Sequence, residues 1–165
     1  MILVLRKSLA RGFNPKFDGM SLSDVKVYPC LFSNKQLCSD IFRIRNEVFV
    51  HEQQVSREEE FDEFEDTSVH YLGTVDDTPA GTARWRITPQ GIKLERFAVL
   101  GSMRNTGIGS MILKKVLADV QTIGLPIYLN AQIKAIPFYE RQGFKKVGEL
   151  FVEANIDHFK MVLDN

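Results

Sequence analysis

A glycine-containing turn at the start of a helix is the clearest candidate for a binding site in this sequence. Residues 94–99 predict a buried strand, and a helical apolar stripe follows at Ile108, Ile112, Val116 and Val120. The turn between them reads Arg104, Asn105, Thr106, Gly107, Ile108, Gly109 and Ser110. The first N–H groups of a helix are unpaired and partly positive, so they can bind phosphate where no Cβ blocks its approach. The turn is therefore a candidate anion site, and a plain strand-to-helix turn is the alternative.

Two familiar phosphate-binding signatures do not fit this turn. A P-loop requires Gly-Lys-Ser/Thr at fixed spacing, which does not follow here. A dinucleotide fingerprint requires a third glycine where Ile112 stands. The ligand must therefore be inferred from other segments.

The order of predicted elements indicates one domain of mixed α/β (α+β) type. Strands are predicted at 25–28, 69–74, 80–87, 92–99, 127–131, 144–153 and 158–163. Helices are predicted at 35–50 with Ser33 as cap, after the glycine turn, and at 136–142 before Gly143. Leu37, Ile41 and Ile44 form the apolar stripe of the first helix, so Arg45 is expected to point away from the core. An acidic stretch at 57–66 has little periodicity and predicts a solvated loop or short irregular helix.

Composition bounds the class of partner. The 165 residues carry no net charge at pH 7, which favours neither nucleic acid nor an anionic membrane. Arg84, Trp85 and Arg86 could suggest a nucleic-acid surface, but strand packing explains them better. Only Cys30 and Cys38 are present, too few for a disulfide framework, so we expect a cytoplasmic protein. Residues 1–24 are basic without acids until Asp18 and predict a leader, flexible or for targeting, or a true start at Met20.

Four separated segments in this order resemble the GNAT superfamily of acetyltransferases. They are Leu94–Val99, the pattern Arg104-x-x-Gly107-x-Gly109, Leu129–Gln132 and Pro137–Phe144. Within the superfamily, residues 49–53, the acidic stretch with His70 beyond it, and residues 151–158 look most like the ElaA/YjcF-type branch. The resemblance covers 25–165 and implies one domain with a mixed sheet of six to seven strands, splayed central parallel strands and about four helices.

The resemblance also implies a co-substrate, acetyl-CoA, lying between the splayed strands. Backbone groups of Phe97, Ala98 and Val99 would bind the pantetheine arm and polarise the thioester carbonyl. Amides of Arg104, Asn105, Thr106, Gly107, Ile108, Gly109 and Ser110 would hold the pyrophosphate. Asn130 and Phe138 would complete the cofactor side. No metal is expected, because no cluster of His, Cys and carboxylate residues has ligand spacing.

Direct transfer to a primary amine requires an acid and a base. Tyr139 is the expected acid for the leaving thiolate, with a packed core tyrosine as the alternative. Glu95, expected on the same strand face as Phe97 and Val99, is the expected base, although a nearby arginine could instead pair with it. The other titratable candidates are Glu52, His51, His70 and His158.

The acceptor is less defined than the co-substrate. A small-molecule or peptide amine fits best, since the acidic stretch would border the acceptor side in this family and favour a cation. A monomer or homodimer is expected. The alternatives are a non-catalytic acyl-CoA-binding module of the same fold and a nucleotide-binding domain of another fold.

Overall fold

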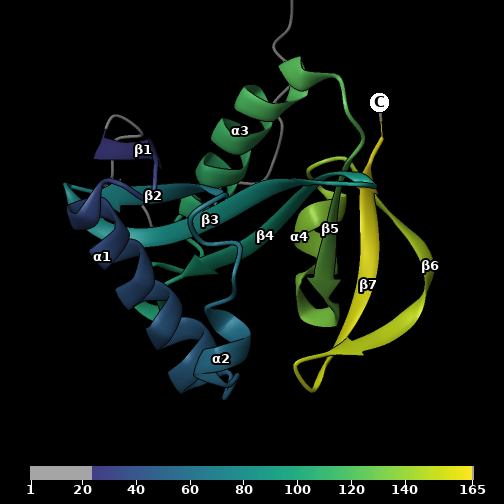
Figure 1. Cartoon of the computed structure of the whole chain (residues 1–165), viewed down its shortest axis with the longest axis horizontal. Helices are drawn as coiled ribbons and strands as arrows, with labels where there is room; N and C mark the ends of the chain where they lie inside the picture. The colour runs from purple at the N-terminus through teal and green to yellow at the C-terminus, as the bar shows by residue number, and fades with distance from the viewer. Residues whose placement is uncertain (1–23, 165) are drawn as a thin grey trace, which may run out of the picture.

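A seven-stranded mixed sheet forms the centre of the computed structural model, which describes residues 24–164 (Figure 1). Its spatial order is β1-β2-β3-β4-β5-β7-β6. The strands are β1 Val25–Cys30, β2 Val69–Val75, β3 Thr78–Thr88, β4 Gly91–Val99, β5 Ile127–Gln132, β6 Phe144–Glu153 and β7 Ile156–Leu163. The single domain, the mixed sheet and the strand number predicted from sequence are all confirmed.

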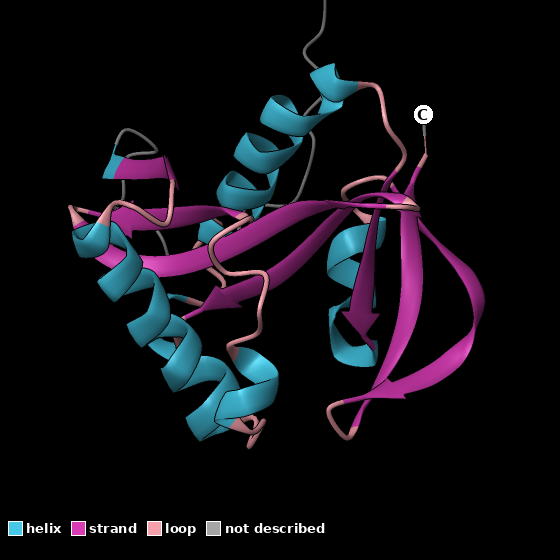
Figure 2. Ribbon diagram, in the orientation of Figure 1, coloured by secondary structure: helices cyan, strands magenta, loops and turns pink. Residues whose placement is uncertain are grey.

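Strands β4 and β5 are parallel neighbours that separate after three residues. They pair only from Ile92 with Ile127 to Leu94 with Leu129, whereas the other neighbouring strands are antiparallel. Figure 2 shows the consequence: strands β2–β4 run across the molecule, and β5, β7 and β6 diverge from them on one side. The central splay predicted from the resemblance is therefore present.

The described residues contain four α-helices, α1 Lys35–Arg45, α2 Arg57–Glu60, α3 Ile108–Val120 and α4 Ile136–Glu140. Of these, α1, α3 and α4 cover the two faces of this sheet. Ile41 and Ile44 of α1 pack with Leu72 and Ala98 on one face. The apolar side chains of α3 and α4 pack on the other face, as Figure 1 shows for α1 and α3.

Two glycines set how closely α3 approaches the sheet. A Cβ added at Gly73 or Gly81 would lie 2.7 or 2.8 Å from Cδ1 of Ile112, nearer than atoms can pack. The absence of side chains there lets α3 lie directly on β2 and β3. Its first turn is thereby held beside the end of β4.

The first helix departs from its prediction in two ways. Asn34, not Ser33, caps it, and the Asn34 side chain accepts a 3.3 Å hydrogen bond from the N–H of Leu37. The helix then continues past Arg45 as a π-helix, Asn46–Glu52, rather than as α-helix to residue 50. The wider turn brings Glu52 and Gln53 toward the splayed strands, and such π-segments are frequent at functional sites.

The leader predicted at residues 1–24 lies almost wholly outside the described residues, as does a start at Met20. Between residues 24 and 164, the structure has no helix both long and apolar enough to cross a bilayer.

Candidate functional site

A cavity of about 750 Å³ occupies the gap between β4 and β5. One wall comes from the π-helix, the acidic segment 57–66 and β4. The opposite wall comes from β5, α4 and the turn between β6 and β7. Residues distant in sequence therefore meet at the point where the parallel strands separate.

The cavity brings together about half of the residues predicted for the site. Those that line it are Glu95, Phe97, Ala98, Val99, Arg104, Asn130 and Tyr139. Asn105, Thr106, Gly107, Ile108, Gly109, Ser110 and Phe138 do not line it. The glycine turn thus lies beyond the cavity, adjoining it through Arg104.

The inner edge of β4 is open along the cavity. Ala98 and Val99 pair with Thr82 and Gly81 of β3 on the outer side, but β4 has no partner in β5 beyond Leu94. Backbone N–H and C=O groups require partners when water is excluded from them. An extended polar ligand in the cavity could therefore pair with this edge as an additional strand would.

A β-bulge reverses the side-chain alternation of β4. Arg96 has φ of 57°, and the register with β3 shifts between Thr82 and Arg84. Glu95 consequently bonds Arg84 on the α1 face, whereas Phe97 meets the ring of Tyr139 at 6.2 Å on the α4 face. The expectation that Glu95 shares a face with Phe97 and Val99 is wrong, because the sequence pattern assumed an unbroken strand.

The N-terminus of α3 fits an anionic ligand. Gly107 caps this helix in the left-handed region, with φ of 90°, and no side chain caps the helix. A Cβ at Gly107 would meet no atom within 4 Å, so the space before the first turn is open. The side chain of Ile108 is buried in the core, so only its backbone could contact a ligand. Unpaired amides and the helix dipole make this end suitable for a pyrophosphate.

Arg104 connects the glycine turn to the cavity wall. Its Nε donates to the carbonyl of Val99 at 3.0 Å, and its Nη2 pairs with the carboxylate of Glu52. The guanidinium is therefore held where the open edge of β4 ends. Glu52, a candidate base from sequence, is occupied by this ion pair.

Tyr139 presents a protonated phenol to the cavity. Its ring packs edge-on against Phe97, Phe138 and Phe144, with centroids 6.2, 5.0 and 5.8 Å away. Within residues 24–164 its hydroxyl makes no hydrogen bond, so it is available to a ligand. Burial raises the pKa of Tyr139 above its ordinary value, which keeps the hydroxyl protonated at neutral pH.

Glu95 is bound into ion pairs rather than free in the cavity. Its carboxylate pairs with Arg84 and with Arg86, the latter at 2.8 Å, and Lys93 lies 3.8 Å away. Burial opposes ionisation, but these three cations keep the pKa of Glu95 below its ordinary value. A carboxylate stabilised in this way is a weak proton acceptor.

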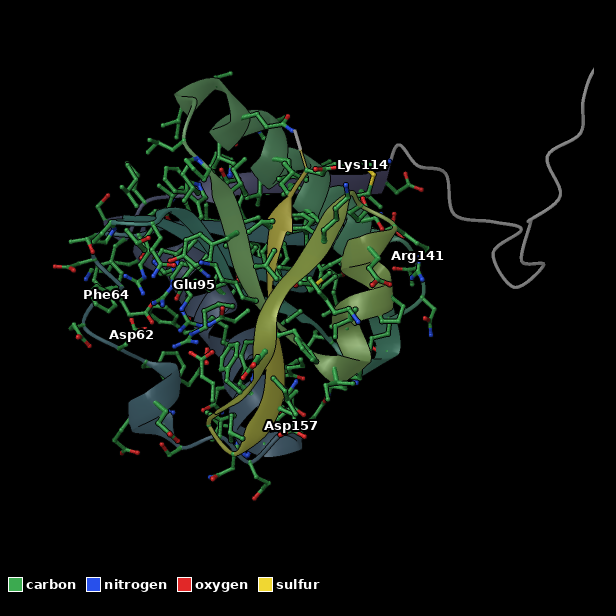
Figure 3. All side chains as sticks on the ribbon, turned by 90° about the vertical axis from the view of Figure 1, so that its right-hand side faces the viewer. Asp62, Phe64, Glu95, Lys114, Arg141 and Asp157 are labelled. Atoms are coloured by element: carbon green, nitrogen blue, oxygen red, sulfur yellow. The ribbon has the colours of Figure 1, made fainter. Side chains whose placement is uncertain are left out.

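The acidic segment 57–66, expected to be a solvated loop or a short irregular helix, begins as the short helix α2 and is only partly exposed to solvent. Glu60 is fully buried, and Glu65 and Asp62 keep only 12% and 19% of their side-chain surface exposed. Figure 3 shows Asp62, Phe64 and Glu95 on one side of the molecule. The segment lies against buried arginines, because isolated charges could not be buried without partners.

Two of these arginines are completely buried. Arg45, expected to point away from the core, pairs with Glu60 at 2.5 Å and Glu65 at 2.7 Å. Arg84 pairs with Asp62 at 2.7 Å and Glu65 at 2.9 Å. Arg84, next to Trp85, is therefore part of the packed interior, in agreement with strand packing rather than a nucleic-acid surface.

The three histidines of the chain have different environments. His70 is fully buried, and its Nε2 lies 2.7 Å from the carbonyl of Glu65. Burial lowers the pKa of His70, which favours the neutral ring. His51 contacts Asn46 on the protein surface at 2.8 Å, whereas His158 lines the cavity.

Two polar contacts at the site were not predicted from sequence. Gln53, which follows the π-helix, accepts a 2.7 Å hydrogen bond from Gln132 of β5, joining the two walls. Glu153 accepts a 3.0 Å hydrogen bond from Asn130 at the β6–β7 end. Both pairs are far apart in sequence, so local patterns contain no signal for them.

Across residues 24–164, no cluster of three or more His, Cys, Asp or Glu side chains could hold a metal ion.

A sequence model described as the acetyltransferase (GNAT) domain matches residues 31–165 of this chain. The chain belongs to the GNAT acetyltransferase family. The "Uncharacterized N-acetyltransferase YjcF" of Bacillus subtilis is 42% identical over 135 residues, covering 79% of this chain and 95% of that protein. "Uncharacterized protein YyaT" of the same organism is 35% identical over 126 residues, covering 74% and 85%.

Solved structures share the fold at low sequence identity. Escherichia coli ElaA superposes with a TM-score of 0.76 and 23% identity, covering 85% of this chain and 99% of that chain. An acyl-CoA N-acyltransferase from Pseudomonas aeruginosa gives 0.74 and 21%, with the same coverage. The NatC complex bound to Gag peptide and CoA gives 0.63 and 15%, covering 85% and 98%. Together with YjcF, ElaA supports the ElaA/YjcF-type branch of the family.

Proposed function

We propose that this GNAT protein transfers the acetyl group of acetyl-CoA directly to a primary amine in the cytoplasm. The observation that carries the proposal is the open edge of β4 along a cavity that also receives Tyr139. Membership of an acetyltransferase family supports the reaction class, and the related NatC structure contains CoA. The buried thiols of Cys30 and Cys38, unpaired as a disulfide, suit a reducing compartment.

The cofactor side is assigned from groups at the start of α3, along the open edge of β4, and on β5 and α4. Amides of Arg104–Ser110 at the start of α3 bind the pyrophosphate, which requires the open space in front of Gly107. Backbone groups of 97–99 bind the pantetheine arm and polarise the thioester carbonyl. Asn130 lines the same cavity, and Phe138 supports Tyr139 through ring packing.

Tyr139 serves as the general acid in this proposal. The leaving sulfur needs a proton when the carbon–sulfur bond breaks, and the buried phenol retains one across the physiological range. Aromatic rings surround the phenol, so a lasting phenolate charge there would be unfavourable. The proton therefore returns to the phenol once the amine nitrogen releases its own.

Glu95 is better suited to holding the site than to accepting a proton. The carboxylate joins β4 to Arg84 and Arg86 on β3, next to the bulge at Arg96. Its ion pairs would have to weaken for it to take a proton from an ammonium group. We therefore assign Glu95 as a positioning residue for the strand that faces the thioester.

The acceptor is proposed to be a cationic small molecule or peptide amine. Glu59 and Glu153 line the cavity and are exposed at its border, where they would attract an ammonium group. The internal carboxylates of the acidic segment contribute less than expected, since arginines neutralise them. Charge at the border, rather than the whole segment, thus selects the acceptor.

The experiment is a paired measurement of binding and turnover. Thermal stabilisation by coenzyme A, but not by ATP or NAD, is expected from a coenzyme A site. Thiol release from acetyl-CoA is then followed with a polyamine, an amino sugar, an N-terminal peptide and a lysine peptide. Binding without amine-dependent thiol release would identify a non-catalytic acyl-CoA module instead. Stabilisation by a nucleotide alone would place the anion site in another functional class.

A further inference from the structure

We propose that His158 of β7 is the general base that deprotonates the acceptor amine. This inference rests on the proposed acetyl transfer and adds the group that the site otherwise lacks. An alkylammonium has a pKa of about 10.4, so removing its proton at neutral pH needs an acceptor near the attacking nitrogen. His158 lines the cavity from the β6–β7 side.

The hydrogen bond made by one ring nitrogen defines the role of the other. Nδ1 of His158 lies 2.7 Å from the backbone carbonyl of Ile156. A carbonyl can only accept, so Nδ1 carries the hydrogen and the neutral ring has its lone pair on Nε2. Nε2 makes no hydrogen bond to any residue in 24–164. It is also not among the fully buried polar atoms without a partner, which include Nδ1 of His70. The free nitrogen is therefore the one with a lone pair.

The ring is held in one orientation. It stacks on Phe151 of β6 with centroids 5.8 Å apart and planes 22° apart, and only 8% of the residue is exposed. Together with the Ile156 contact, this packing restricts rotation about the side-chain bonds. A fixed imidazole is what a proton acceptor in a narrow cavity requires.

The sheet places His158 opposite the proposed acid. His158 pairs directly with Gln132 of β5, so the two side chains share a face. Gln132 bonds Gln53 on the α1 side of the sheet. The preceding residue, Ala131, points to the opposite face and packs in the core that contains Tyr139. His158 would then face the acceptor amine from one side of the cleft, and Tyr139 would face the leaving sulfur from the other.

The other candidate bases are occupied or distant. Glu95 and Glu52 are paired with arginines, and His70 lies in the buried network under α1. His51 does not line the cavity. His158 is the remaining candidate from the sequence with a free, accessible lone pair.

Charged groups from several elements share the cavity with His158. Glu52 comes from the π-helix, Arg104 from the turn before α3, and Glu59, Glu60 and Asp62 from the acidic segment. The remaining ones are Arg86, Lys93, Glu95, Arg96, Lys134 and Glu153. Asp157 adjoins His158 in β7.

The proton balance closes with two residues. Nε2 of His158 takes one proton from the ammonium form of the acceptor, directly or through one water. The amine nitrogen attacks the thioester carbonyl carbon, a carbon–nitrogen bond forms, and the carbon–sulfur bond breaks. Tyr139 gives its proton to sulfur and recovers one from the new amide nitrogen, while His158 releases its proton to solvent. The products are an amide, coenzyme A with a free thiol, and one proton.

The test is the pH dependence of kcat/KM for His158→Asn with an amine that the wild type acetylates. Asparagine keeps a donor near the Nδ1 position but has no group at Nε2. We expect kcat/KM at pH 7 to fall about 100-fold, within the usual range for a general base, with coenzyme A stabilisation unchanged. The deficit should shrink at higher pH, because the amine then loses its proton unaided. His51→Asn, which removes a histidine outside the cavity, should retain the wild-type profile.

Two results would overturn the role of His158. One is that the wild type is active and His158→Asn has the same pH profile of kcat/KM as the wild type. The other is a ring nitrogen NMR spectrum of the wild type showing the Nε2-protonated tautomer for His158, a readout that requires neither variant nor turnover. A wild type that binds coenzyme A but acetylates no amine would instead overturn the proposed function itself.

Discussion

Arg45 donates from Nε to the carboxylate of Glu60 across 2.5 Å, and both side chains are buried. The pair connects the end of α1 to the acidic segment that forms one wall of the cavity. Arg96 in the β4 bulge also contacts Glu60, at 3.2 Å. The wall is therefore tied to the bulged strand through ion pairs that are largely buried.

Breaking this pair should destabilise the protein strongly. Arg45→Met would leave the carboxylates of Glu60 and Glu65 buried without their main partner. We expect the free energy of unfolding to fall by about 3–5 kcal/mol, the usual cost of uncompensated buried charge. Urea denaturation measures it.

An exposed arginine of the same helix is the control. Arg43 pairs with Asp40 at 3.4 Å with more than half of its side chain exposed. Arg43→Met should change stability by no more than about 0.5 kcal/mol. Equal effects of the two substitutions would mean that the buried network contributes little.

Tyr139→Phe should separate chemistry from binding. The ring and its packing against Phe97 and Phe144 remain, but the proton donor is lost. We expect kcat to fall about 100-fold, as for loss of a general acid, with coenzyme A affinity nearly unchanged. Tyr128→Phe, which removes a hydroxyl bonded to Thr88 outside the cavity, serves as the control in the same assay. Wild-type turnover by Tyr139→Phe would remove this residue from the mechanism.

Gly107→Glu should abolish coenzyme A binding, measured by calorimetry. The new side chain would bring bulk and negative charge to the open space before α3. Gly124→Glu is a matched control, since Gly124 also has positive φ, 75° against 90°, and also has open space around it. Backbone strain is thus similar in both variants, and only the first should lose the ligand. Retained affinity in Gly107→Glu would place the pyrophosphate elsewhere.

Asp62 should make stability depend on pH in the acid range. Partial burial opposes ionisation, but the bonds and charge of Arg84 lower the pKa of Asp62 from 3.8 to about 2. The unfolded chain therefore binds this proton first as the pH falls. The stabilisation is present above about pH 4 and is lost between pH 4 and 2, amounting to about 1 kcal/mol after solvent screening.

Asp62→Asn should flatten that part of the stability profile, measured by urea unfolding from pH 2 to 6. Asp77→Asn, in the exposed pair with Lys26, is expected to leave the slope as in the wild type. An unaltered acid limb in Asp62→Asn would assign the loss to other carboxylates.

Periodicity and turn chemistry were sufficient for most elements. The bounds of β6 match those predicted, and every predicted strand is present within three residues at either end. The π-helix could not be predicted, because its apolar spacing over two turns resembles that of an α-helix. The bulge at Arg96 was equally hidden, since bulges depend on how neighbouring strands pair.

The site was predictable where it follows local motifs. Tyr139, Asn130 and Arg104 line the cavity as expected from their segments. Arg45 was assigned to the wrong environment, because its partners Glu60 and Glu65 are 15 and 20 residues away. His158 was one of several candidate bases; its place in the cavity and its contact with Ile156 could be seen only in the folded chain.

The most direct test of the account is initial-velocity kinetics with acetyl-CoA and a primary amine both varied. Direct transfer requires both substrates on the enzyme together, so reciprocal plots should give intersecting lines, with thiol release dependent on the amine. Parallel lines with a labelled acetyl group retained on the protein would show a covalent acetyl-enzyme and contradict direct transfer.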